Sequence, residues 1–122
     1  MTSVTNMTSM FRDATIFNQS VSSFNTSNVS AMASLFENAT AFNQPVPFDT
    51  TKVGDMFRMF YNATSFNQTI SFNVPAIYSM YGMFAGATSF NKSVTLTNMG
   101  VNLVSFVNID LSLMFGGASS FN

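Results

Sequence analysis

The sequence repeats one motif along its whole length, and this repetition restricts the folds that are available. The motif Met-x-x-Met-Phe-x-x-Ala-Thr-x-Phe-Asn-Gln first occupies residues 7–19, and copies end in Phe-Asn pairs that are 25, 24, 24 and 31 residues apart. A repeat of this length indicates a protein built from stacked, similar units. We therefore expect one domain over residues 1–122, and the excess in the last period predicts an insertion near 97–106. The expected repeats are 1–24, 25–48, 49–72, 73–96 and 97–122.

Each repeat has two halves with different apolar spacing. Apolar residues in the first half recur at steps of three and four, which predicts one face of a short helix. In the first copy these residues are Val4, Met7, Met10, Phe11 and Ala14. The second half ends in an alternating pattern, as in Val46-x-Phe48 and Ile70-x-Phe72, which predicts a short strand. The expected fold class is an α/β repeat solenoid of about five turns, with one short helix and one short strand in each turn of about 24 residues.

The residue before the repeated alanine is Asp, Asn or Gly in every copy. Asp, Asn and Gly tolerate a left-handed backbone, which is a common way for a helix to end. We therefore expect a left-handed residue and a helix end at each of these positions. They are Asp13, Asn38, Asn62, Gly86 and Gly117.

Equivalent residues of stacked units lie about 4.8 Å apart, so repeated side chains form columns. A column of asparagines at that spacing can hydrogen-bond along its length, and we expect it to be buried. The expected asparagine column is Asn18, Asn43, Asn67, Asn91 and Asn122. The expected aromatic core column is Phe17, Phe42, Phe66, Phe90 and Phe121. The Met and Phe stripes could instead form an adhesive surface, but their identical spacing in every repeat favours a core.

Composition argues against several classes of function. Charged residues make up 7% of the chain, the net charge is −1, and there is no His or Cys. A zinc or thiolate metal site, a disulfide scaffold and a basic nucleic-acid surface are therefore not expected. The acidic residues fall at unrelated positions of the repeat, so we expect no catalytic residues, no cofactor and no enzymatic activity. No apolar run is long enough for a membrane span.

Several asparagines stand in Asn-x-Ser/Thr sequences, which are acceptors for N-glycosylation. Asn38 and Asn62 are the candidates, because an exposed helix end is expected there. The alternative is that these residues serve turn formation alone. The asparagines of the expected buried column could not carry a sugar.

The repeated motif, followed by Phe-Asn-Thr-Ser-Asn-Val-Ser at residues 24–30, resembles the BspA-like repeat of bacterial surface proteins. This resemblance covers essentially the whole chain. That family has repeats of 24–26 residues and belongs with the leucine-rich-repeat group. Its members usually have Trp-Asp where this chain has Phe24-Asn25, Phe48-Asp49 and Phe72-Asn73. The resemblance implies a leucine-rich-repeat-like architecture and a non-enzymatic protein outside the cell or on its surface.

Two functions fit these expectations. The first is structural: the protein associates with itself, end to end or laterally, into an extracellular filament, sheath or surface layer. Low charge offers little repulsion against such contact, and both ends are expected to present apolar cross-sections. The second is an adhesin or host-contact module of a longer repeat protein, whose partner is a protein or glycan on a host or neighbouring cell. No signal peptide is visible, so we expect that a targeting segment has been removed or that the chain is a piece of a longer array.

Overall fold

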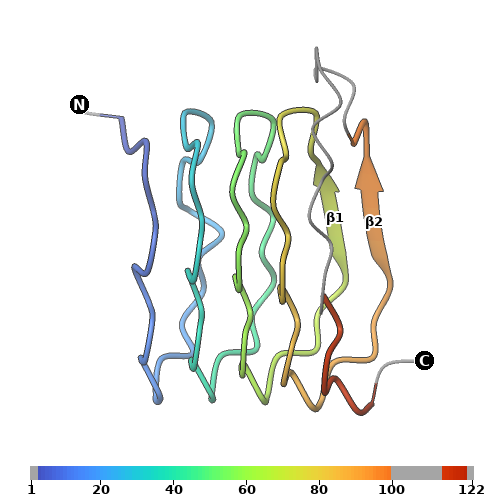
Figure 1. The fold of residues 1–122 in the computed structure, drawn as a ribbon. Helices are drawn as coiled ribbons and strands as arrows, with labels where there is room; N and C mark the ends of the chain where they lie inside the picture. The colour runs from blue at the N-terminus through green and yellow to red at the C-terminus, as the bar shows by residue number, and fades with distance from the viewer. Residues whose placement is uncertain (1–2, 100–113, 121–122) are drawn as a thin grey trace.

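The repeats form coils that lie side by side in a computed structural model, which describes residues 3–99 and 114–120 (Figure 1). Parallel bridges connect Asn6 to Ala31, Ala31 to Asp55, and Asp55 to Ser79. We take these four residues as the starts of coils 1 to 4. The coils are then residues 6–30, 31–54, 55–78 and 79–99, and residues 114–120 are the described part of coil 5.

Two short strands lie on one side of the stack. Strand β1 spans Ile70–Asn73 and pairs in parallel with β2, Val94–Thr97, so that Ile70 lies opposite Val94. Alternate residues of β1 are buried, as the alternating sequence predicts. Coils 1 and 2 have no regular strand at the equivalent positions. We call this side the strand wall; it consists of residues 21–24, 46–49, 70–73 and 94–97.

The opposite side is made by the Met-Phe half of each repeat, and it contains no helix in the described residues. The backbone N–H groups of Met7, Ser9, Phe11 and Asp13 donate to carbonyl groups of coil 2, at 2.8–2.9 Å. The N–H groups in between close turns within the coil, as Met10 does to the Met7 carbonyl at 3.2 Å. We call this side the ribbon wall. Its segments are residues 7–14, 32–39, 56–63, 80–87 and 114–118.

The prediction of an α/β solenoid with one helix per turn, in a leucine-rich-repeat-like architecture, is therefore wrong. An α-helix needs successive N–H groups to bond four residues back within the same segment. Here alternate N–H groups bond the next coil, and others bond within their own coil, to carbonyl groups three residues back or to side-chain oxygens two residues back. Successive turns of this kind place apolar residues inward at steps of three and four, which is the spacing that a helix also produces.

Left-handed residues occur at all five positions that the sequence indicated. Asp13, Asn38, Asn62, Gly86 and Gly117 have φ between 56° and 74°, so this part of the prediction is confirmed. They end turns of the ribbon rather than helices. A second left-handed residue lies four positions earlier in coils 1 to 4, with φ between 51° and 60°. These residues are Ser9, Ser34, Arg58 and Gly82.

Stacked phenylalanine rings fill the space between the two walls. Phe17, Phe42, Phe66 and Phe90 form one column with ring centroids 5.8–5.9 Å apart. A second column lies beside it at 4.1–4.4 Å, with its own rings 5.3–5.5 Å apart. Its members are Phe11, Phe36, Phe60, Phe84 and Phe115. Each fully buried ring contributes roughly 2–3 kcal/mol by removal from water.

Some of the predicted features lie outside the described residues. They are Phe121, Asn122 and most of the insertion expected at 97–106. Within the described part of the chain, no helix could cross a membrane.

Candidate interaction surfaces

The predicted asparagines of coils 1 to 4 form a hydrogen-bonded column at the turn after the ribbon. The backbone N–H of Asn43 donates to the side-chain oxygen of Asn18 at 2.8 Å, and Asn67 and Asn91 repeat this contact with the preceding coil. Gln44 donates from its side chain to the same Asn18 oxygen, at 3.1 Å. The column is exposed or half-buried, so the expectation of a buried column is wrong. The turn projects from the packed phenylalanines, and a side chain that bonds the neighbouring backbone needs no apolar cover.

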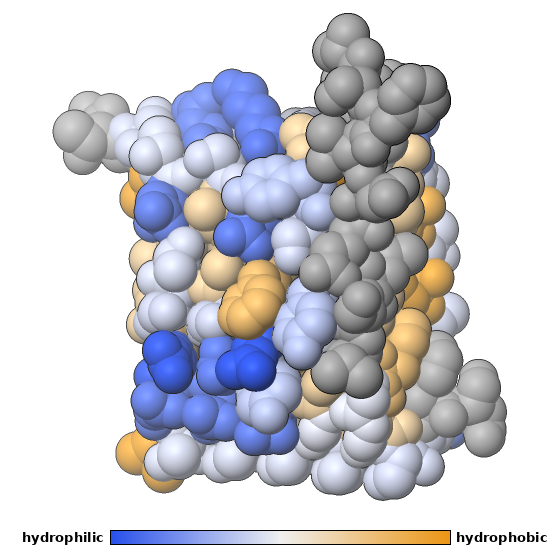
Figure 2. All heavy atoms as spheres, viewed as in Figure 1, coloured by the Kyte–Doolittle hydropathy of each residue, from blue (hydrophilic) through white to orange (hydrophobic). Residues whose placement is uncertain are grey.

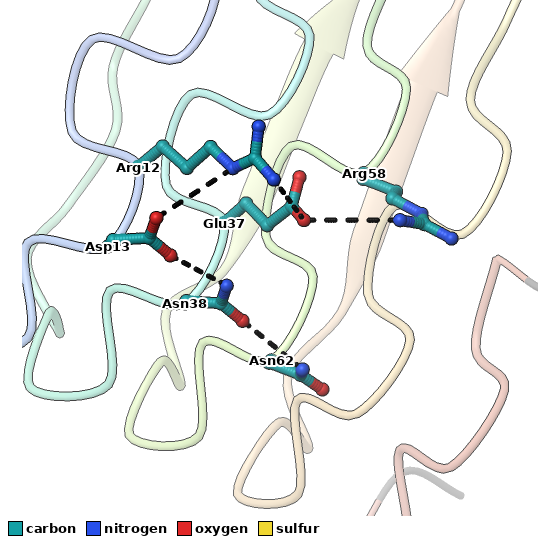
Figure 3. A network of polar contacts seen from close by, with 6 residues as sticks. All are labelled: Arg12, Asp13, Glu37, Asn38, Arg58 and Asn62. Atoms are coloured by element: carbon teal, nitrogen blue, oxygen red, sulfur yellow. Dashed lines mark hydrogen bonds and ion pairs between the residues drawn. The ribbon is translucent and has the colours of Figure 1, made fainter.

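The left-handed residues form a second polar column on the ribbon wall. Asn38 donates from its side-chain nitrogen to Asp13 at 2.7 Å, and Asn62 donates in the same way to Asn38 at 3.2 Å (Figure 3). The Asn62 side-chain oxygen then occupies the space that a Cβ atom would need at Gly86. Asn38 and Asn62, the candidate glycosylation sites, are therefore half-buried and bonded to neighbouring coils rather than exposed at a helix end.

Charged residues meet at one place on the ribbon wall. The Glu37 side chain is 6% exposed, and its carboxylate lies 3.8 Å from the Arg12 guanidinium and 3.9 Å from that of Arg58 (Figure 3). Arg12 also approaches Asp13 at 4.0 Å, but both side chains are more than half exposed. Exposed pairs of this kind contribute little to stability, whereas a buried carboxylate requires compensating charge. The two arginines therefore serve mainly to neutralise Glu37.

Aromatic side chains surround Arg58. Its guanidinium lies 4.5 Å from the ring centroid of Tyr61 and 5.2 Å from that of Phe57, which in turn stacks on Tyr81 at 5.4 Å. Arg58 has φ 51°, a conformation that costs a non-glycine residue about 1–2 kcal/mol. The face shown in Figure 2 is mostly polar and carries a hydrophobic spot near its middle. We call Arg58, Phe57, Tyr61 and Tyr81 the Arg58 cluster.

Sequence reasoning missed the Arg58 cluster because it considered the residues that repeat. The cluster occupies positions where the residue type changes from coil to coil. The position of Phe57 is Thr8 in coil 1, Ala33 in coil 2 and Tyr81 in coil 4. The sequence did offer one signal. Large aromatic residues occur at positions where core packing does not determine the residue type.

The face of coil 1 that points away from coil 2 is hollow and apolar. Val4 and Met10 are each 47% exposed and Phe24 is 38% exposed, whereas Val29 and Leu35, which occupy the same repeat positions as Val4 and Met10, are fully buried. These side chains surround a hollow of about 330 Å³. Its lining is Ser3, Val4, Met7, Met10, Phe24, Asn25 and Asn28. We call this surface the coil-1 face.

Two further observations concern the acidic side chains of the described residues. No group of three or more acidic, His or Cys side chains in the described part of the chain could hold a metal ion. The pKa of Asp49 is lowered, chiefly because its carboxylate accepts hydrogen bonds from the hydroxyl and the N–H of Thr51 at 2.7 and 3.0 Å. This contact closes a surface turn. The fold defines the class: a stacked repeat protein.

The family follows from two overlapping matches. Residues 1–99 and 46–122 match the model of the family described as "Mycoplasma protein of unknown function, DUF285". The two matches cover the whole chain, so the chain belongs to this family. No curated protein and no solved structure matches it significantly.

Proposed function

We propose that this chain is a non-enzymatic structural protein of the cell surface that associates with copies of itself into a filament, sheath or surface layer. The observation that supports this function most is that like residues meet like residues between coils. Phe36 stacks on Phe60 and Asn62 bonds Asn38, so each coil recognises a neighbour with its own sequence. Such contacts are equally available to a coil of another copy. The likeness of the motif to BspA-like surface repeats supports a position outside the cell.

Self-association is tested by analytical ultracentrifugation of the 122-residue chain over a wide range of concentration, with electron microscopy of the same samples. We expect mass to increase with concentration and regular assemblies to be visible at the upper end. A monodisperse monomer at every concentration would contradict the proposal.

The Arg58 cluster favours a second candidate function, a binding module for a protein or glycan on a host or neighbouring cell. Residues that are held in uncommon backbone conformations often occur at functional sites. Arg58 is such a residue, and its Nε is buried without a hydrogen-bond partner among the described residues. Coil 4 has Gly82 at the equivalent position, so the turn conformation itself does not require an arginine there.

Arg58→Gly separates this second function from a structural role. Glycine removes the penalty of positive φ, but the change also leaves the buried Glu37 carboxylate with Arg12 alone, so the melting temperature should fall and binding is compared at a temperature where both chains are folded. Binding to an immobilised glycan panel, or to intact cells, should be lost if the cluster recognises a ligand. Equal binding by the variant and the unchanged chain would argue against a role for the cluster.

A further inference from the structure

We propose that Phe57 binds a neutral glycan by stacking one face of its ring, the face turned toward coil 2, on a sugar ring. This inference rests on the second proposed function and assigns a ligand class and a point of contact to the Arg58 cluster. The chain has three tyrosines, and all of them belong to coils 3 and 4, around this ring; they are Tyr61, Tyr78 and Tyr81. A protein that docks on the same ring is the alternative that the test must separate.

The Phe57 ring is covered on one face only. Tyr81 stacks on the face toward coil 4, with ring centroids 5.4 Å apart and an angle of 11° between the planes. The equivalent position in coil 2 is Ala33, whose methyl group is too small to cover a ring. No second ring stacks on Phe57 among the described residues, whereas Phe60 of the core has ring partners in both neighbouring coils. The outer pair of rings therefore ends at Phe57 with an unpaired face on a partly exposed side chain.

An unpaired aromatic face suits a sugar ring. The face carries the negative part of the aromatic quadrupole, and the C–H groups on one face of a sugar carry slight positive charge. The sugar hydroxyls then remain at the edge for polar contacts. Asp55 uses one carboxylate oxygen to accept the Phe57 N–H at 2.9 Å. Its other oxygen accepts no hydrogen bond from residues 3–99 and 114–120, so it is available to a sugar hydroxyl.

The charges around the ring favour a neutral ligand. A cation would have to replace the Arg58 guanidinium, which already lies 4.5 Å from the Tyr61 ring centroid. An anion would compete with the Glu37 carboxylate for Arg12 and Arg58, which approach it at 3.8 and 3.9 Å. Such competition would leave a buried carboxylate with less compensating charge. A neutral sugar disturbs neither contact.

The small extent of the apolar surface favours a sugar over a protein. A stable protein interface buries about 800 Å² on each partner, around an apolar centre. The hydrophobic spot near the middle of the face in Figure 2 is small and is bordered by polar residues. Of the large apolar side chains that are exposed in the described residues, only Tyr78 belongs to coils 3 and 4. One ring face is sufficient to hold one sugar.

Tyr78 extends this surface along coil 3. The residue is 51% exposed, and its ring lies over the backbone of Gly54, where a Cβ atom would come within 2.6 Å of the ring. Gly54 precedes Phe57 by three residues, which span at most about 10 Å of chain. Linked sugar rings can cover this distance. We therefore expect an oligosaccharide to bind more tightly than a single sugar.

A tryptophan at position 57 keeps the ring face and reports on it. The chain has no tryptophan, so Phe57→Trp supplies the only one. Titration with neutral oligosaccharides of glucose, galactose, mannose and N-acetylglucosamine should shift its fluorescence in a saturable way for at least one sugar. Ile16→Trp, at a residue of coil 1 that is 92% exposed, is the matched control and should not respond. The absence of a saturable shift with every one of these sugars would overturn the inference.

Two further variants locate the sugar on the open ring face. Phe57→Leu keeps an apolar side chain without a ring and should weaken binding to the same immobilised oligosaccharide about tenfold. Ala33→Phe places a ring against the open face and should weaken binding at least as much. Rings at positions 57 and 81 show that this position of the coil accepts one, so the melting temperature should not fall. Ala33→Ser leaves the face open and should bind as the unchanged chain does. Full binding by Ala33→Phe would contradict the proposed contact.

Binding to intact cells separates this inference from the function on which it rests. Binding that is lost with Arg58→Gly but kept by Ala33→Phe would overturn the sugar contact and leave the second function standing. Binding that survives enzymatic removal of the cells' glycans would assign a protein partner, with the same consequence. A chain that binds neither cells nor oligosaccharides would overturn both.

Discussion

The ribbon wall and the strand wall hold the same coils together in different ways. Between coils 1 and 2, the ribbon wall is joined by four backbone N–H groups, from Met7 to Asp13, and coils 2 and 3 repeat the pattern. The strand wall has regular backbone pairing only between β1 and β2 within the described residues. Pro45 directly precedes the equivalent segment of coil 2 and Pro47 lies within it, and neither can donate a ladder bond.

Hydroxyl groups replace part of the missing ladder on the strand wall. Thr26 donates to the Asp49 carbonyl at 3.1 Å and accepts from the Asp49 N–H at 2.9 Å, and Thr50 donates to the Asn73 carbonyl at 2.7 Å. Between coils 3 and 4 the equivalent contact is a backbone bond from the Val74 N–H to the Thr97 carbonyl at 2.9 Å. The ribbon wall therefore sets the register of the stack, and the strand wall adapts to it. Four sets of variants test this difference.

Removing a ring behind the ribbon wall should have the largest effect. Phe60→Ala deletes a fully buried side chain that stacks on Phe36, Phe66 and Phe84, and should lower the free energy of unfolding by about 3–5 kcal/mol. Phe24→Ala removes a ring of the strand wall that is 38% exposed, and should cost less than half as much. Urea denaturation measures both. Equal losses would contradict the dominance of the ribbon side.

A change at one left-handed position should have the next largest effect. Gly86→Ala places a side chain at φ 73°, which costs about 1–2 kcal/mol, and its Cβ would overlap the Asn62 side-chain oxygen. Adding Asn62→Ala removes the overlapping side-chain oxygen and keeps a non-glycine residue at position 62, so the backbone cost at position 86 remains. Thermal unfolding of the double variant should therefore show partial recovery. Complete recovery would mean that the left-handed backbone itself costs nothing, contrary to this account.

The hydroxyl contacts of the strand wall predict a smaller loss. Thr50→Val leaves the Asn73 carbonyl without the Thr50 hydroxyl and should destabilise the fold by about 1 kcal/mol. Thr69→Val, at an exposed position, serves as the control and should change stability by less than about 0.5 kcal/mol. If Thr50→Val lowers stability no more than Thr69→Val does, the Thr50 hydroxyl does not stabilise the strand wall.

The smallest effect concerns pH. Because the pKa of Asp49 is lower in the folded chain than in the unfolded chain, its ionised form stabilises the fold at neutral pH. This contribution should decrease as pH falls through the unfolded value of about 4 and onward through the lower folded pKa. Asp49→Asn should reduce the decrease in melting temperature between pH 6 and pH 2.5. Asn25 already makes the same turn with an amide, accepting from Ser27 at 2.7 and 3.1 Å, so the variant retains the geometry. An unchanged pH profile would contradict this role.

Sequence reasoning succeeded where a residue's own chemistry decides its place. Asn and Gly before the repeated alanine indicated left-handed backbone, and Asn38 and Gly86 have it. The spacing of Phe17, Phe42, Phe66 and Phe90 indicated a column, and their rings stack. In each case the relevant constraint is local or repeats with the sequence.

The helix prediction failed because the deciding contacts are not local. Met7, Met10, Phe11 and Ala14 have the spacing of a helix face, and a run of turns gives the same spacing. The two structures differ in the acceptors of alternate N–H groups. Here the acceptor lies 24 residues further along the chain, as the Ala31 carbonyl does for the Met7 N–H. The Arg58 cluster escaped notice for a related reason, since Phe57 and Tyr81 become neighbours only when the coils stack.

Like-on-like contact also has a consequence for how such genes change length. Each coil presents the same kinds of residue to the next coil as the previous coil presents to it. An in-frame deletion of a 24-residue unit such as 53–76 would therefore bring Asn38 beside Gly86 and Asn43 beside Asn91. The junction would reproduce contacts that Asn62 and Asn67 already make. Unequal recombination between repeats can therefore lengthen or shorten the protein by whole coils while each product still folds.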